Sequence, residues 1–215
     1  MTQLLESEAS EHRNNRGMPT VAKRVNDFAR SGYRLLRELY ERTLHPHRRR
    51  TARARLLRAA PVESVLFICH GNICRSSYAE FAFRRQASKV AAVVVASAGF
   101  VGPDRQPPSL ALQAALRRGL DMSGHRSRLL TQPMLDAAGI IVVMSAEQAA
   151  LVRRRVPRDV VVILGDLDPQ PISQRTIRDP WSAGEDVFEA SYARIDRCLP
   201  ALMLVLDSAP FAIPE

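Results

Sequence analysis

The pattern of apolar and polar positions divides the 215-residue chain into two parts. From residue 61 onward, short apolar runs alternate with longer segments in which apolar residues recur at helical spacing. The short runs predict strands over residues 64–69, 92–97, 139–144 and 160–164. The longer segments predict helices over residues 76–88, 107–118, 146–155 and 184–206, with a short one over 132–138. This alternation is typical of a parallel sheet covered by helices on both faces.

We therefore predict an α/β fold, a three-layer flavodoxin-like sandwich with a four-stranded parallel sheet, in a domain spanning residues 61–215. Residues 1–60 form an extension with a different pattern. Residues 1–20 are polar and are expected to be partly disordered. Apolar residues near helical spacing predict an amphipathic helix over residues 21–44, which we expect His45-Pro46-His47 to end. A basic segment then leads into the domain.

The segment between the first predicted strand and the first predicted helix of the domain has the features of an anion-binding loop. It begins at Cys69 and reads Cys-His-Gly-Asn-Ile-Cys-Arg-Ser. A strand that leads through a short turn into a helix directs several backbone N–H groups and the positive end of the helix dipole at one point. We therefore expect this loop to bind a phosphate group. Its members after the cysteine are His70, Gly71, Asn72, Ile73, Cys74, Arg75 and Ser76.

Two side chains of the loop point to nucleophilic catalysis on the bound phosphate. The positive field favours the thiolate of Cys69, which is the nucleophilic form of the side chain. Arg75 follows after five intervening residues, and its planar guanidinium can hold two phosphate oxygens at once. Asn72 suits a turn with left-handed backbone, and Ser76 can cap the helix that follows.

Further motifs follow the loop along the chain. They are Ser97-Ala98-Gly99 after an apolar run, Gly124-His125-Arg126-Ser127-Arg128, Val142-Val143-Met144 and Asp179-Pro180-Trp181. Together with residues 65–76, these motifs resemble, in kind and in order, those of the low-molecular-weight protein tyrosine phosphatases, and the resemblance covers residues 61–207. The chain departs from the usual family pattern at two positions: Ser77 stands where proline is usual, and Trp181 where tyrosine is frequent.

The resemblance implies a protein tyrosine phosphatase that hydrolyses phosphotyrosine through a phosphocysteine intermediate. Cys69 is then the catalytic nucleophile and Arg75 the clamp that holds the phosphate. The family suggests that the hydroxyl of Ser76 also hydrogen-bonds the sulfur of Cys69. Asn72 supports the shape of the loop, and Trp181 offers an aromatic wall to the substrate. No metal and no other cofactor is expected.

The reaction also needs a carboxylic acid near the phosphate, because the leaving oxygen must take up a proton. Two Asp-Pro pairs compete for this role, Asp168-Pro169 and Asp179-Pro180. A following proline restricts the backbone of both aspartates in the same way, so local chemistry does not choose between them. The adjacent Trp181 and the order of the family's motifs favour Asp179 as the catalytic acid.

Two other functions stay open at this point. Arsenate reduction uses similar chemistry because arsenate mimics phosphate, but it needs further thiols, and Cys198 is the one cysteine outside the loop. A non-catalytic phosphate-binding docking module is the second alternative. Loss of Cys69, Arg75 or Asp179 would have indicated it, and all three are present. Cys74 is either a packed thiol or the partner of Cys69 in a reversible disulfide.

The net charge of +9 belongs almost entirely to the extension. Residues 1–60 hold 14 Lys and Arg against 6 Asp and Glu, whereas residues 61–215 hold 17 against 16. We consider three roles for the extension: a solvated tail, a docking helix for an acidic protein partner or for the domain itself, or a contact for nucleic acid or an anionic membrane. Nucleic acid is the least favoured partner, because aromatic residues are not interleaved with the arginines.

Cysteine usage and hydropathy indicate the compartment. Three cysteines are too few for a secreted disulfide framework, and no apolar run approaches the length of a membrane span. The N-terminus also lacks the pattern of a signal sequence. We therefore expect a cytoplasmic enzyme that acts on a phosphotyrosine-containing protein. The residues do not select its physiological substrate or its oligomeric state.

Overall fold

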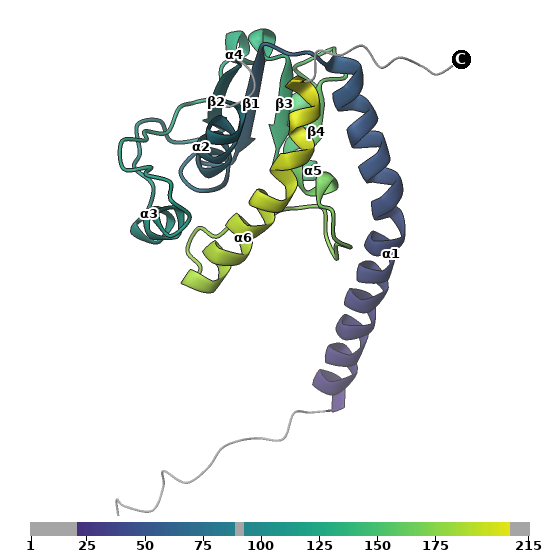
Figure 1. The fold of residues 1–215 in the computed structure, drawn as a ribbon. Coiled ribbons are helices and arrows are strands. Elements are labelled where there is room, and N and C mark those ends of the chain that lie inside the picture. Colours follow the sequence, from purple (N-terminus) through teal and green to yellow (C-terminus); the bar gives the residue numbers. More distant parts are fainter. Residues whose placement is uncertain (1–20, 89–92, 207–215) are drawn as a thin grey trace, which may run out of the picture. The chain divides into compact units, whose positions relative to one another are not determined.

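The computed structural model describes residues 21–88 and 93–206. The chain divides between Arg37 and Glu38 into two units, and the second unit contains the α/β fold. Its centre is a four-stranded parallel sheet with the order β2-β1-β3-β4 (Figure 1). The strands are β1 Ser64–Cys69, β2 Val94–Gly99, β3 Ile140–Val143 and β4 Val161–Ile163, each within two residues of its predicted ends.

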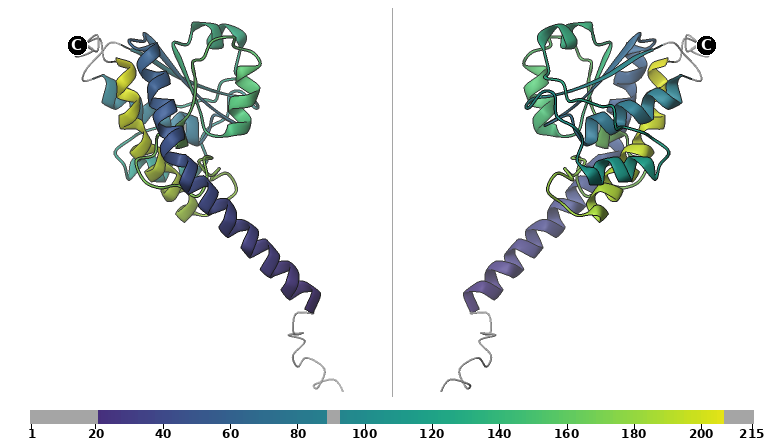
Figure 2. Two further views of the ribbon diagram at one scale, coloured as in Figure 1. Left: turned by 90° about the vertical axis from the view of Figure 1, so that its right-hand side faces the viewer. Right: turned by 90° about the vertical axis from the view of Figure 1, so that its left-hand side faces the viewer.

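Helices cover both faces of the sheet, so the predicted three-layer α/β sandwich is confirmed (Figure 2). One face carries α2 Arg75–Ala87, α6 Glu185–Cys198 and the last turns of α1. The other face carries α4 Gln132–Ala137 and α5 Ala146–Arg153, while α3 Ser109–Leu116 packs against α6. Two 3-10 helices complete the chain order, Leu164–Leu167 after β4 and Leu199–Leu206 as the continuation of α6.

Strand β1 shows how the sequence divides the core between the two faces. Successive side chains of a strand point to opposite sides of the sheet. Val65, Phe67 and Cys69 belong to the core that includes α2 and α6, whereas Leu66 and Ile68 belong to the core that includes α5. Because both faces are covered, the strand is apolar along its length, as is typical of parallel sheets.

Helix α1 runs from Val21 to Ala59. The expectation that His45-Pro46-His47 ends this helix was wrong. Proline in a helix interior removes one hydrogen bond and crowds the preceding turn. Ala52 and Leu56 are buried in the core with α2 and α6, however, and this packing holds the turns that follow the proline. The last turns of α1 therefore pack against the α/β core.

The first unit contains the beginning of α1, whose large apolar side chains face solvent. Phe28, Tyr33, Leu35 and Leu36 are all exposed. No helix in the described part of the chain combines the length and the apolar character needed to cross a membrane.

Candidate active site

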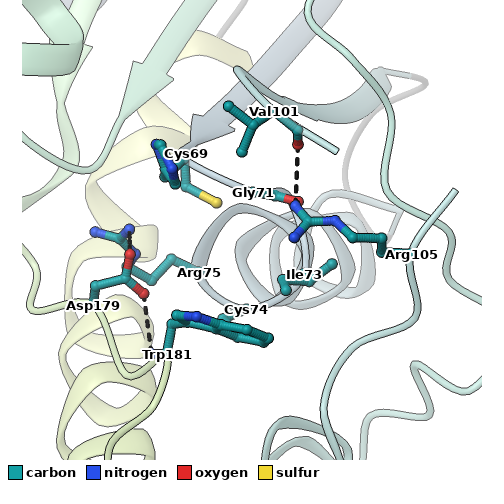
Figure 3. Close-up of a pocket in the computed structure, with 10 residues that line it drawn as sticks. Cys69, Gly71, Ile73, Cys74, Arg75, Val101, Arg105, Asp179 and Trp181 are labelled. Carbon is teal, nitrogen blue, oxygen red and sulfur yellow. Dashed lines mark hydrogen bonds and ion pairs between the residues drawn. The ribbon is translucent and has the colours of Figure 1, made fainter. Parts of the chain in front are cut away.

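A pocket lies at the carboxyl end of β1, beside the loop between β1 and α2. Ligands of open parallel sheets bind at this edge, where the strand order reverses. The pocket has a volume of about 190 Å³, and three segments of the chain line it (Figure 3). They contribute Cys69, His70, Gly71, Ile73, Cys74 and Arg75 from the loop, Val101 and Arg105 from the segment after β2, and Asp179 and Trp181 from the segment before α6.

The structure brings most of the predicted site residues to this one pocket. The predicted nucleophile, clamp, acid and aromatic residue all line it, namely Cys69, Arg75, Asp179 and Trp181. Asn72 and Ser76 are fully buried behind the lining residues. The competing Asp168 lies elsewhere, because its buried carboxylate is paired with Arg194 and Arg197.

The side chain of Cys69 points into the pocket (Figure 3). Its Sγ accepts a hydrogen bond from the hydroxyl of Ser76 at 3.0 Å and another from the backbone N–H of Asn72 at 3.3 Å. Hydrogen bonds donated to a group stabilise its charged form when that form is the better acceptor. Both contacts therefore favour a negative charge on the sulfur, the state that a nucleophilic cysteine requires.

The backbone of the loop provides donors for an anion. The N–H groups of Gly71, Ile73 and Cys74 donate to no acceptor among the described residues. Helix α2 begins immediately after them at Arg75, so the positive end of its dipole faces the same place. Free amides next to a helix N-terminus form the arrangement that binds phosphate groups in many folds.

The guanidinium of Arg75 provides a further donor. Its Nη1 donates to the carbonyl oxygen of Ile177 at 3.2 Å, and its Nη2 forms an ion pair with Asp179. The Nε–H of Arg75 is buried and has no acceptor within the described residues. A buried donor without a partner carries a desolvation cost of about 1–3 kcal/mol, which a bound anion can remove.

Asn72 holds the loop in its shape. Its backbone has a φ of 53°, in the left-handed region that asparagine tolerates. The side-chain Nδ2 donates to the hydroxyls of Ser76 at 2.9 Å and Ser97 at 2.7 Å, and Oδ1 accepts from the backbone N–H of Arg128 at 2.9 Å. Its polar side-chain atoms are therefore satisfied, which fixes the turn around the sulfur of Cys69.

His125 supports the same turn from the outside. Its Nε2 lies 2.7 Å from the carbonyl oxygen of Asn72. Because a carbonyl can only accept, this nitrogen must carry the proton and donate. Burial lowers the pKa of His125, against the opposite effect of the hydrogen bond to Asn72. The neutral imidazole is therefore the favoured form, and His125 serves as a structural donor.

Gly99 explains why the Ser-Ala-Gly motif lies beside the loop. A β-carbon at this position would lie 2.8 Å from the backbone nitrogen of Asn72 and 2.9 Å from backbone atoms of His70 and Gly71. Real β-carbons do not approach backbone atoms so closely. Glycine thus lets the end of β2 pass directly against the loop.

Cys74 lines the pocket but differs from Cys69 in its environment. Burial raises its pKa far above the ordinary thiol value, and the neighbouring Cys69 acts in the same direction. Cys74 therefore stays a protonated thiol and is a poor nucleophile at neutral pH.

Reasoning from the sequence did not identify three residues around the loop as site residues. The hydroxyl of Ser97 donates to the carboxylate of Glu80, which is 3% exposed and lies 3.1 Å from a guanidinium nitrogen of Arg128. Ser97 had a signal, because it belongs to the Ser-Ala-Gly motif. Glu80 and the pocket-lining Arg105 lie in ordinary helix and loop sequence, and no local pattern marks them.

Comparisons with known proteins agree with this geometry. The family model described as low molecular weight phosphotyrosine protein phosphatase matches residues 64–209. The low molecular weight protein-tyrosine-phosphatase Etp of Escherichia coli K12 is 33% identical over 137 residues, which cover 62% of this chain and 88% of that protein. The human low molecular weight phosphotyrosine protein phosphatase is 31% identical over 151 residues, which cover 66% of this chain and 94% of that protein.

Solved structures show the same similarity. The tyrosine phosphatase Wzb from Escherichia coli K30, in complex with sulphate, has a TM-score of 0.58 and 25% identity, covering 64% of this chain and 94% of that one. The tyrosine phosphatase amsI from Erwinia amylovora has a TM-score of 0.58 and 27% identity, covering 66% and 91%. The loop, its position at the sheet edge and these matches lead to one conclusion: the protein belongs to the low molecular weight phosphotyrosine protein phosphatase family.

Proposed function

We propose that this protein is a tyrosine phosphatase that hydrolyses phosphotyrosine in proteins through a phosphocysteine intermediate. The observation that carries the proposal is the setting of Cys69. Its sulfur accepts two hydrogen bonds inside a pocket that Arg75 and Asp179 also line. Membership of a family whose relatives are named tyrosine phosphatases supports the same chemistry.

In the first step, the thiolate of Cys69 attacks the phosphorus of the substrate. The S–P bond forms while the bond between phosphorus and the tyrosyl oxygen breaks, with the two groups in line. The loop amides and Arg75 hold the three remaining phosphate oxygens as charge is redistributed over them. Asp179, in its protonated form, gives its proton to the departing tyrosyl oxygen.

Asp179 must exchange partners before it can act as an acid. In the structure its Oδ2 is paired with Arg75 and its Oδ1 accepts from the backbone N–H of Trp181 at 3.2 Å. A phosphate dianion that binds Arg75 takes the place of the carboxylate. The aspartate then lies beside negative charge instead of positive charge, which favours its protonated form.

In the second step, water attacks the phosphocysteine. Asp179, now ionised, takes a proton from the water, and the P–S bond breaks as inorganic phosphate forms. The departing sulfur of Cys69 regains the hydrogen bonds from Ser76 and from the N–H of Asn72, so the thiolate leaves at low cost.

The pocket walls support an aromatic substrate. Ile73 and Val101 are apolar, and Trp181 is 55% exposed with its ring at the pocket (Figure 3). Contact between a tyrosyl ring and these apolar and aromatic side chains stabilises the bound substrate. The short side chain of phosphoserine cannot make this contact. We therefore expect phosphotyrosine peptides to be hydrolysed faster than phosphoserine peptides of the same sequence.

The alternative of arsenate reduction is not favoured by the surroundings of the third cysteine. Cys198 is fully buried in α6, and burial raises the pKa of its thiol to about 12. Arsenate reduction by thiol–disulfide exchange needs a further cysteine whose thiolate is accessible.

The three cysteines are free thiols, which supports a reducing compartment such as the cytoplasm.

The replacement Cys69→Ser tests the proposal. We expect kcat on an aryl phosphate to fall by about 10⁴-fold or more, because the hydroxyl is far less nucleophilic than the thiolate. Inorganic phosphate should still bind, as measured by calorimetry, since the loop amides and Arg75 remain. Cys198→Ser is the matched control, because it changes a buried cysteine outside the pocket and should keep its turnover. Substantial turnover by Cys69→Ser would contradict the proposed mechanism.

A further inference from the structure

Arg105 is the one residue of the pocket lining with a permanent charge that the proposed reaction does not use. It comes from the segment after β2 and lies across the pocket from Asp179 and Arg75 (Figure 3). Its side chain is half-buried, so the guanidinium borders both the pocket and the solvent. This position suits contact with a part of the substrate outside the phosphate itself.

Hydrogen bonds to the backbone hold the guanidinium of Arg105 in place. Its Nε donates to the carbonyl oxygen of Gly102 at 2.9 Å, and its Nη2 donates to the carbonyl oxygens of Gly71 and Val101, each at 3.1 Å. One side chain thus joins the Cys69 loop to the loop after β2. A guanidinium fixed in this way loses little further entropy when it binds a ligand.

Two glycines make room for the guanidinium of Arg105 in this position. A β-carbon at Gly71 would lie 2.7 Å from Nη2 of Arg105, and one at Gly102 would lie 2.3 Å from its Nε. Gly102 also has a φ of 63°, in the left-handed region that favours glycine. The guanidinium therefore packs directly against the backbone of both glycines. A side chain at residue 71 or 102 would occupy the space that the guanidinium fills.

The charge of Arg105 is not neutralised in the described part of the chain. All three of its hydrogen bonds go to uncharged carbonyl groups, whereas Arg75 is paired with Asp179. The preceding Asp104 is exposed and forms no ion pair with it among the described residues. Because an arginine keeps its proton in proteins, the rim of the pocket carries one positive charge that has no anionic partner among the described residues.

We propose that Arg105 forms a subsite for a side-chain carboxylate adjacent to the phosphotyrosine, so that the enzyme prefers acidic substrate sites. This inference rests on the proposed phosphatase function. The phosphate already has Arg75, the loop amides and the helix dipole as partners, and of these Arg75 lies across the pocket from Arg105 (Figure 3). The Nε–H and both N–H groups of Nη2 donate to backbone carbonyl oxygens, whereas the two N–H groups of Nη1 donate to no acceptor within the described residues and are available to a carboxylate oxygen.

Pairs of phosphotyrosine peptides test the subsite. In each pair, a glutamate on one side of the phosphotyrosine is replaced by glutamine, so that the members differ in charge and not in shape. We expect the full-length enzyme to give a kcat/KM about fivefold higher on the glutamate member for at least one of the two flanking positions. The ratio should approach one at 1 M salt, where the Debye length is about 3 Å.

Variants of Arg105 assign the preference to this residue. Arg105→Gln should bring the ratio of the two kcat/KM values to about one, and Arg105→Lys should keep part of it because the charge remains. Arg154→Gln is the matched control. It removes the same charge from an exposed position at the end of α5, a helix that packs against β3 and β4 and contributes no residue to the pocket, and it should leave the ratio unchanged.

The outcomes separate this inference from the proposed function. If the wild-type enzyme hydrolyses neither peptide, the phosphatase function itself fails. If it hydrolyses both members of each pair equally, the subsite is overturned while the function stands. A uniform loss in Arg105→Gln with the ratio preserved would also overturn it, because Arg105 would then act on the phosphate common to both peptides. Should Arg105→Gln fail to fold, the wild-type ratio and its salt dependence decide.

Discussion

Asp168 and Asp179 each precede a proline, yet the structure places them in opposite settings. The side chain of Asp168 is 1% exposed, and its carboxylate lies 3.1 Å from donor nitrogens of both Arg194 and Arg197. The side chain of Asp179 is 42% exposed and pairs with a single arginine, Arg75, at the pocket. The same dipeptide therefore forms a closed ion cluster in one place and an open, exchangeable contact in the other.

This difference shows which of the two carboxylates can exchange its partner for a ligand. A buried aspartate with two arginines has no capacity left for a ligand, and removing it leaves buried charges unpaired. An exposed aspartate with one partner can give up that partner when a phosphate arrives. The two regions are alike in other respects, because each contains a buried cysteine and a buried histidine that donates to a backbone carbonyl. Those residues are Cys74 and His125 at the pocket, and Cys198 and His45 near Asp168.

The largest effect should come from Asp179→Asn. We expect kcat to fall by about 10²–10⁴-fold on aryl phosphates with poor leaving groups, because asparagine cannot supply a proton. The loss should shrink as the leaving group becomes more acidic. The buried Arg75 loses its charged partner, so the midpoint of urea unfolding should also fall, and kcat is therefore measured where the protein is folded. A loss of equal size on good and poor leaving groups would argue against Asp179 as the acid.

Asp168→Asn should lower the stability of the protein while largely keeping its turnover. The change leaves Arg194 and Arg197 without their shared carboxylate, so we expect the free energy of unfolding to fall by about 3 kcal/mol. Urea unfolding followed by circular dichroism measures this value. Turnover by the folded protein should stay within about fivefold of wild type. If Asp168→Asn instead lost activity without losing stability, the two aspartates would have to exchange roles.

The sequence could predict features that depend on neighbouring residues. The Cys69 loop is one such feature, because its strand, turn and helix start are contiguous, and the strand ends were predicted within two residues. The choice of Asp179 over Asp168 needed the order of the family's motifs, since both Asp-Pro pairs look alike locally. The pairing of Asp168 with two arginines of α6 leaves no local trace in the sequence.

Features that depend on distant residues were out of reach. Helix α1 continues beyond Pro46 because Ala52 and Leu56 enter the core, and a rule about proline alone cannot show this. Arg105 reaches the carbonyl oxygen of Gly71, 34 positions earlier, and Glu80 contacts Ser97, 17 positions later. Both contacts follow from the way β1 and β2 lie side by side, which only the folded sheet establishes.

A smaller effect concerns His125, the histidine at the pocket. Burial lowers the pKa of His125, so the folded protein keeps this imidazole neutral while the unfolded chain takes up a proton near pH 6.5. The unfolded state thus binds more protons below that pH, and the free energy of unfolding should fall as the pH is lowered from 7 toward 5.5. His125→Gln should flatten this dependence between the two pH values. Urea unfolding of wild type and of His125→Gln at pH 7 and at pH 5.5 measures the difference.

The smallest effect on turnover should come from the two buried thiols, and it sharpens the comparison between the regions. We expect Cys74→Ala and Cys198→Ala each to keep kcat within about threefold of wild type, because burial keeps both side chains protonated and outside the chemistry. The two variants should differ only after oxidation. Peroxide converts the thiolate of Cys69 to a sulfenic acid, and a neighbouring thiol can displace water from it to form a disulfide.

Cys74 lines the same pocket as Cys69, whereas Cys198 does not. Wild type and Cys198→Ala should therefore regain activity when a dithiol is added after peroxide treatment. Cys74→Ala should regain much less, because its sulfenic acid has no protecting partner and is oxidised further to the irreversible sulfinic acid. Equal recovery of all three proteins would show that Cys74 is a packed thiol, as inert as Cys198. The pocket would then differ from the Asp168 region in its exchangeable carboxylate and in the nucleophile Cys69, whereas Cys74 and Cys198 would be equivalent packed thiols.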